Sequence, residues 1–76
     1  MFSFSIIHTE ILNTDDKVYH IKIPQNEMIL FGYIVESLEG WAFHTLLDKK
    51  ENILYVEVVK DYITDFEILL DKMINY

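Results

Sequence analysis

The sequence predicts one small α+β domain in which a single sheet is covered on one face by two helices. Two observations favour this fold class. Segments with alternating apolar and polar residues, typical of strands, are followed by segments with the apolar spacing of amphipathic helices. The 76 residues leave room for only one domain and one core.

The N-terminal part of the chain predicts a β-hairpin. Residues 6–12 and 17–23 are rich in apolar and β-branched side chains, and the second segment places Tyr19, Ile21 and Ile23 on one face. Four turn-forming residues, 13–16, separate the two segments. We therefore expect residues 6–12 to pair antiparallel with residues 17–23.

A helix is predicted from residue 26 to residue 39. Pro24 ends the preceding strand, because proline has no N–H for the ladder but fits a first helical turn. Gly40 stands where a left-handed residue ends a helix. The buried stripe of this helix would consist of Met28, Phe31, Ile34, Val35 and Leu38.

The next segments predict a second hairpin, with strands at residues 41–48 and 53–59. If the four polar residues between them form the turn, Asp48 lies opposite Ile53. That register faces Phe43, Thr45 and Leu47 toward the core, opposite Val58, Val56 and Leu54. It pairs His44 with Glu57 and Leu46 with Tyr55 on the other face. We therefore expect Phe43 to be buried, and Trp41 as well.

A second helix is predicted near the C-terminal end. Thr64 and Glu67 have the spacing of a capping box, in which each side chain satisfies a free backbone N–H. The buried stripe would consist of Phe66, Leu69, Leu70 and Met73.

The resulting order, ββαββα, is a ferredoxin-like βαββα unit with an extra N-terminal strand. We expect an antiparallel-rich four-stranded sheet with both helices on one face. Residues 17–23 would lie beside residues 53–59, running parallel to them, with residues 41–48 at the far edge. The N-terminal strand would cover the other edge of residues 17–23.

The segment from about residue 18 to residue 70 resembles a family of small bacterial proteins classed only as a domain of unknown function. The resemblance rests on Pro24 opening a helix, a Glu-Ser-Leu-Glu-Gly helix end at 36–40 and a Thr-Leu-Leu-Asp strand end at 45–48. A Val-rich strand and Asp61 before a Leu-Leu helix complete it, whereas Lys60 stands where the family has proline. The resemblance implies the βαββα order and no activity.

Composition excludes several classes of protein. The formal net charge of −7 opposes nucleic-acid binding, whose affinity comes largely from basic residues on phosphates. The absence of cysteine excludes disulfides and thiolate zinc sites. No signal peptide or membrane-spanning stretch is recognised, so we expect a cytoplasmic protein that does not bind membranes.

No catalytic, metal-binding or cofactor-binding group is predicted. His8, His20 and His44 lack the spacing to another histidine or carboxylate that builds a metal site on a helix. No nucleophile motif or glycine-rich phosphate loop is present. We therefore expect neither enzyme activity nor a cofactor.

The chain is unusually apolar for its length, with 51% hydrophobic residues, which favours a surface that binds another chain. Two candidate interfaces are predicted. One is the uncovered sheet face, with His44, Leu46, Tyr55 and Val59. The other is a notch at Gly32 in the first helix, between Ile29 and Tyr33, into which another backbone could pack. We expect a self-associating module, a homodimer; the alternative is a regulatory domain that binds an unidentified small metabolite at its dimer junction.

Overall fold

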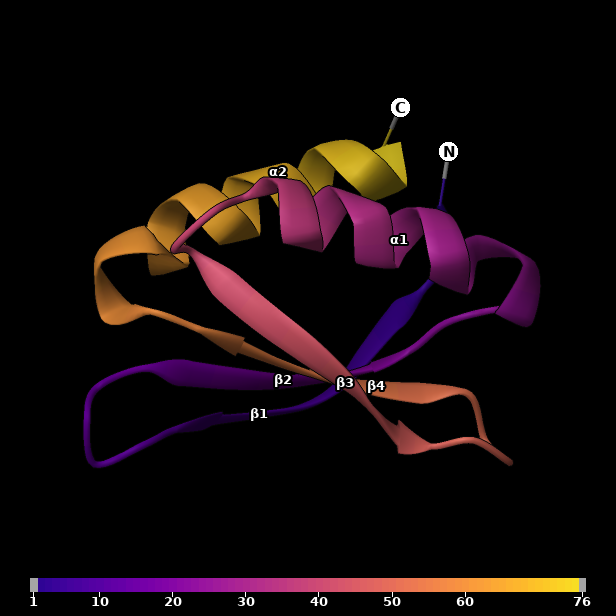
Figure 1. Cartoon of the computed structure of the whole chain (residues 1–76), viewed down its shortest axis with the longest axis horizontal. Coiled ribbons are helices and arrows are strands. Elements are labelled where there is room, and N and C mark those ends of the chain that lie inside the picture. Colours follow the sequence, from indigo (N-terminus) through magenta and orange to yellow (C-terminus); the bar gives the residue numbers. More distant parts are fainter. Residues whose placement is uncertain (1, 76) are drawn as a thin grey trace.

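The computed structural model describes residues 2–75, which form one four-stranded sheet with both α-helices on the same side of it (Figure 1). The predicted α+β fold of ferredoxin-like type is confirmed. In chain order the elements are β1 (Ser5–Ile11), β2 (Lys17–Lys22), α1 (Gln25–Ser37), β3 (Ala42–Asp48), β4 (Ile53–Val58), a 3-10 turn η1 (Lys60–Tyr62) and α2 (Ile63–Asn75).

The strands lie in the order β1-β2-β4-β3, and every neighbouring pair is antiparallel. The predicted pairing of the N-terminal strand with β2 is confirmed, as is the position of β4 beside β2. The predicted parallel direction of β2 and β4 was wrong. After α1 crosses the sheet, β3 runs in the same direction as β2. Because β4 returns from β3 through a tight turn and lies between the two, it must run opposite to both.

The core lies between the sheet and the helices. Phe31 of α1 and Phe66 of α2 have no exposed surface, and Phe66 packs on Tyr19 of β2 with ring centroids 5.5 Å apart. The segment before β1 reaches the same core, where Phe4 meets the Phe31 ring edge-on at 5.3 Å. The remaining buried members are Ile21, Ile23, Val35, Leu54, Val56, Val58, Leu70 and Met73.

The register of the second hairpin differs from the predicted one. Asp48 does lie opposite Ile53, but a β-bulge at Leu47 adds one residue to β3 before the pairing resumes at Leu46 and Leu54. A shift of one residue moves every side chain to the opposite face of a sheet. As a result, Phe43 lies opposite Glu57 with 56% of its surface exposed.

The predicted features of α1 and of its end are largely confirmed. Phe31 and Val35 are buried, while Met28, Ile34 and Leu38 are partly buried against the core. Gly40 has a φ of +80°, the left-handed conformation predicted for it. Trp41 is only partly buried, and its ring stacks on that of Tyr62 with centroids 5.1 Å apart.

The predicted capping box of α2 does not form. The carboxylate of Glu67 instead accepts hydrogen bonds from Lys17 Nζ at 2.6 Å and from Tyr19 Oη at 2.7 Å. Burial, followed by the bond to Glu67, raises the pKa of Tyr19. The hydrogen bonds from Lys17 and Tyr19 lower the pKa of Glu67. The carboxylate therefore ties α2 to β2 and does not close its own helix terminus.

These contacts predict an acid-dependent contribution of Glu67 to stability. A lowered folded-state pKa means that the ionised carboxylate stabilises the fold above the unfolded value near 4.5, and that this stabilisation is lost as the pH falls through the folded-state pKa. Glu67→Gln should therefore lower the free energy of unfolding at pH 7 by up to about 1 kcal/mol, because the pair is partly solvent-screened. Urea denaturation at pH 7 and pH 3 measures this.

The control is Glu51→Gln, which removes a more exposed pair with Lys22. That variant should change the free energy of unfolding little at either pH. The difference between wild type and Glu67→Gln should shrink at pH 3. An undiminished difference there would contradict the assignment.

Candidate interaction site

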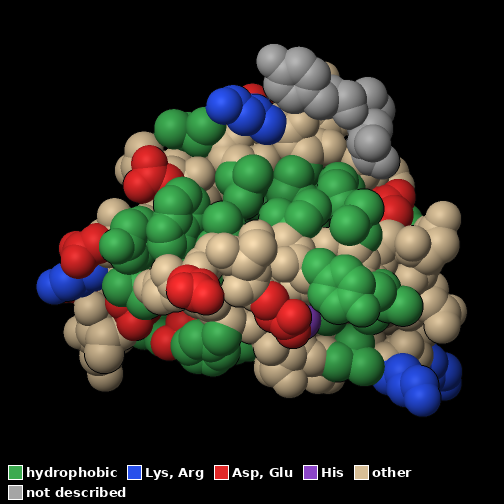
Figure 2. All heavy atoms as spheres, turned by 45° about the horizontal axis from the view of Figure 1, so that its top comes forward, with side chains coloured by type: hydrophobic (Ala, Val, Ile, Leu, Met, Phe, Trp, Pro, Cys, Tyr) green, Lys and Arg blue, Asp and Glu red, His purple; other side chains and the backbone are tan. Residues whose placement is uncertain are grey.

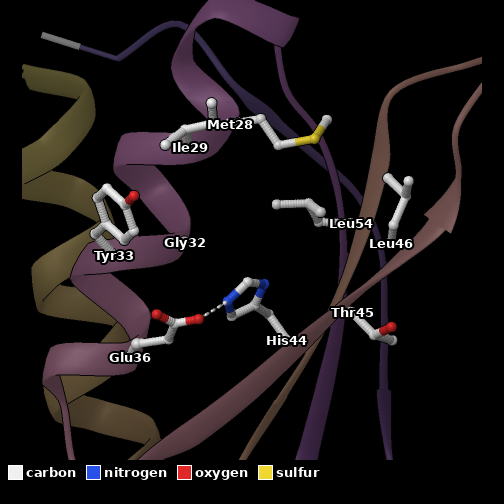
Figure 3. A pocket seen from close by; sticks show the side chains of 9 residues that line it. All are labelled: Met28, Ile29, Gly32, Tyr33, Glu36, His44, Thr45, Leu46 and Leu54. Carbon is white, nitrogen blue, oxygen red and sulfur yellow. Dashed lines mark ion pairs between the residues drawn. The ribbon is translucent and has the colours of Figure 1, made fainter.

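A groove of about 330 Å³ lies between α1 and the edge strand β3 (Figure 3). Its walls are mostly apolar, and its volume is at the lower end of the range for ligand pockets. We call it the α1–β3 groove. It is lined by Met28, Ile29, Gly32, Tyr33 and Glu36 from α1, by His44, Thr45 and Leu46 from β3, and by Leu54 from β4.

Two local features of the chain create this groove. On α1, Ile29 and Tyr33 are one turn apart and line the groove, and they are 70% and 65% exposed. On β3, the bulge at Leu47 turns His44 and Leu46 toward the helices. Both sides therefore present apolar surface that the core does not cover.

Gly32 of α1 lies directly against the side chain of His44 from β3. A Cβ atom at this position would lie 3.1 Å from Cε1 of His44, which is tighter than an ordinary contact. The notch at Gly32 was predicted to receive the backbone of another chain. Instead it is filled from within the same chain by the imidazole of His44, because the register shift brings that side chain under the helix.

His44 and Glu36 form the polar part of the groove. Nε2 of His44 lies 3.5 Å from Oε1 of Glu36 (Figure 3). The imidazole is mostly covered, whereas the Glu36 side chain is largely exposed to solvent. A ring that donates from Nε2 to Glu36 and carries no proton on Nδ1 would present Nδ1 as a hydrogen-bond acceptor. The predicted pairing of His44 with Glu57 was wrong, since His44 lies opposite Val56.

The contact between Gly32 and His44 predicts a non-additive effect of substitutions. Within a helix, Gly→Ala stabilises by up to about 1 kcal/mol through backbone propensity. In the wild-type chain the new methyl group must displace the imidazole of His44. Gly32→Ala should therefore raise the free energy of unfolding by clearly less than this propensity gain. In a His44→Ala background the methyl group meets open space, and the full gain should appear. A double-mutant cycle by urea denaturation measures the coupling; additive effects would contradict the packing.

The structure brings together five of the seven predicted interface residues. Ile29, Gly32 and Tyr33 were assigned to a helix surface, and His44 and Leu46 to the uncovered sheet face. All five line the α1–β3 groove. The placement of His44 and Leu46 on the uncovered face was wrong, because the bulge at Leu47 turns them toward the helices. Tyr55 and Val59 lie outside the groove, and both are partly buried.

The uncovered sheet face carries polar groups beside the exposed ring of Phe43. The rings of His8 and His20 lie 4.8 Å apart on neighbouring strands, and His20 lies 6.0 Å from Tyr55. Tyr55 donates a hydrogen bond of 2.7 Å to Glu57, which raises the pKa of Tyr55. Within residues 2–75, no three histidine or carboxylate side chains are grouped so that they could hold a metal ion.

A second groove, of about 370 Å³, lies between α2 and β1. Lys17, Tyr19 and Glu67 form its polar wall, and Leu70 and Ile74 are among its apolar residues. The sequence does not reveal this groove, because Glu67 fits a capping pattern and nothing in the spacing links it to residues about fifty positions earlier. The ion pair between Lys17 and Glu67 already satisfies these two charged groups.

Comparisons with protein-family models, curated protein sequences and solved structures found no match for this chain. The resemblance to a family of unknown function therefore stays a prediction. Neither helix among residues 2–75 is long and apolar enough to cross a membrane. The functional interpretation rests on the surface itself.

Proposed function

We propose that this protein is a non-enzymatic interaction module that forms a homodimer through α1 and β3. The observation that carries the proposal is the concentration of exposed apolar side chains around the α1–β3 groove, next to an edge strand. Ile29, Tyr33 and Leu46 contribute from the groove, Phe43 from the opposite face of β3, and Leu47 from the bulge. Figure 2, which looks onto the helices, shows hydrophobic patches gathered across this face with acidic side chains between them.

The apolar surface is of a suitable size for a dimer. These five side chains together expose on the order of 600 Å², and a stable interface buries about 800 Å² on each partner. The backbone of β3 would supply part of the remainder. Scattered single apolar residues are normal on a protein surface, whereas several exposed apolar residues on one edge strand and the helix beside it favour an interaction site.

The charge of the chain favours an apolar rather than an ionic interface. Each copy carries a formal net charge of −7, so two copies repel each other at long range. Salt screens such repulsion and leaves apolar contacts intact. A dimer of this kind should therefore tighten as the salt concentration rises, whereas a dimer held by ion pairs would loosen.

Sedimentation equilibrium over a range of protein concentrations tests the proposal. We expect a monomer–dimer equilibrium whose dissociation constant decreases when the NaCl concentration is raised from 50 mM to 500 mM. A chain that stays monomeric at several hundred micromolar and high salt would contradict self-association. A dimer that dissociates with salt would contradict the apolar interface.

A second candidate function is a regulatory domain that binds a small metabolite at the dimer junction. The pairing of His44 with Glu36 favours it, because an oriented imidazole in an apolar groove suits a ligand with an apolar body and one hydrogen-bond donor. A thermal-shift screen with amino acids and nucleotides distinguishes the two functions. A ligand of the folded state raises the melting temperature in wild type and less in His44→Ala.

A further inference from the structure

We infer that the two copies join by antiparallel pairing of their β3 strands around a twofold axis at His44, which makes one continuous eight-stranded sheet. This inference rests on the proposed homodimer and specifies how it is built. The β3 strand lies at one edge of the sheet. Among the described residues, no strand pairs with its outer side.

The register of the hairpin fixes which backbone groups of β3 are free. Val59 donates its N–H to the carbonyl of Trp41, so these two residues form a hydrogen-bonded pair at the start of the ladder. Such pairs recur at every second residue of an antiparallel ladder. The backbone N–H and C=O groups of Phe43 and Thr45 therefore point toward β4. The N–H and C=O groups of Ala42, His44 and Leu46 consequently point outward from the sheet.

The two edges of the sheet differ in how they are protected against a further strand. β1 has its bulge near its middle, at Ile7, and carries Glu10. β3 is regular from Ala42 to Leu46, and its bulge comes only at Leu47. Bulges, charged residues and proline are the usual features that block edge pairing. The segment Ala42–Leu46 contains no Lys, Arg, Asp, Glu or Pro, so β3 is the edge open to another strand.

A second copy of the same strand fits this edge best. A twofold axis at His44 pairs Ala42 with Leu46 of the other copy and His44 with its own equivalent. This register uses the outward backbone groups of all three residues in both copies, whereas a shift along the strand leaves some of these groups unpaired or reaches the bulge.

The side chains of Ala42, His44 and Leu46 face the helices, so the pairing also joins the two α1–β3 grooves. Tyr33 and Ile29 of each copy would border the joined cavity, and the two His44 imidazoles would meet at its centre.

Residue-resolved hydrogen exchange of the ¹⁵N-labelled full chain tests the pairing. Spectra are compared at a concentration where sedimentation gives a monomer and at one where it gives a dimer. The His44 and Leu46 amides should exchange quickly in the monomer and at least about tenfold more slowly in the dimer. The Phe43 and Thr45 amides, which bond to β4, should be protected in both samples.

β1 supplies an internal control, because Leu12 donates to the carbonyl of Asp16 and the Thr9 and Ile11 amides therefore point outward from the other edge. These two amides should exchange quickly in both samples. A dimer whose His44 and Leu46 amides remain fast overturns the strand pairing and leaves the homodimer standing. A dimer that protects Thr9 and Ile11 instead places the contact at β1 and also overturns it. A monomer at every concentration overturns the pairing together with the proposed function.

Discussion

Replacing Phe31 with alanine is expected to remove a large part of the stability of the fold. The Phe31 ring is fully buried between the helices and the sheet, and the ring of Phe4 meets it edge-on. Removing such a ring costs about 3–5 kcal/mol, through lost burial and through the cavity left behind. A 76-residue domain has a free energy of unfolding of roughly 4–11 kcal/mol, so the loss is comparable with the total. Urea denaturation followed by circular dichroism measures it.

Phe43→Ala is the matched control, because it removes the same ring from a position that is 56% exposed. We expect a change in the free energy of unfolding of less than about 1 kcal/mol. The two variants also distinguish the observed register of β3 from the one predicted from the sequence. Under the predicted register Phe43 would lie in the core and its loss would be as costly as that of Phe31. Equal destabilisation by both variants would contradict the bulge at Leu47.

Placing a glutamate in the α1–β3 groove is expected to abolish self-association. Tyr33 lies on α1 and Leu46 on β3, and both are substantially exposed in the single chain, so their replacement should leave the fold intact. In a twofold dimer each substitution buries two carboxylates, and each carboxylate would lose its solvation without gaining a partner. Tyr33→Glu and Leu46→Glu should each weaken the dimer at least about tenfold. Sedimentation of each variant against the wild type measures the change.

Ile68→Glu is the matched control for this experiment. Ile68 is 51% exposed on α2 and does not line the α1–β3 groove, yet the substitution adds the same charge to each copy. It should weaken the dimer only through the general increase in repulsion, and raising the salt concentration should reverse that effect. If Ile68→Glu separates the copies as effectively as Tyr33→Glu, the interface includes α2. If neither groove variant has an effect, the interface is elsewhere.

The two hairpins, the two helices and their order could be predicted from the sequence by itself, because local patterns determine them. Turn-forming residues separate the N-terminal strands, and Pro24 and Gly40 mark the ends of the first helix through fixed backbone preferences. The apolar stripes were correct because helical periodicity leaves one side available for burial. For the same reason Phe31 and Phe66 could be placed in the core without any coordinates.

Only the tertiary structure decided the features that make the candidate site. The bulge at Leu47 is one extra residue in a ladder, and apolar residues on both sides of β3 gave the sequence no pattern that could reveal it. That single residue exchanged Phe43 for His44 on the helix side and brought His44 onto Gly32. The direction of β4 and the bonds from Lys17 and Tyr19 to Glu67 likewise depend on contacts between distant segments. Local propensity determines which elements form, but the faces that meet are set by pairing and packing across the whole chain.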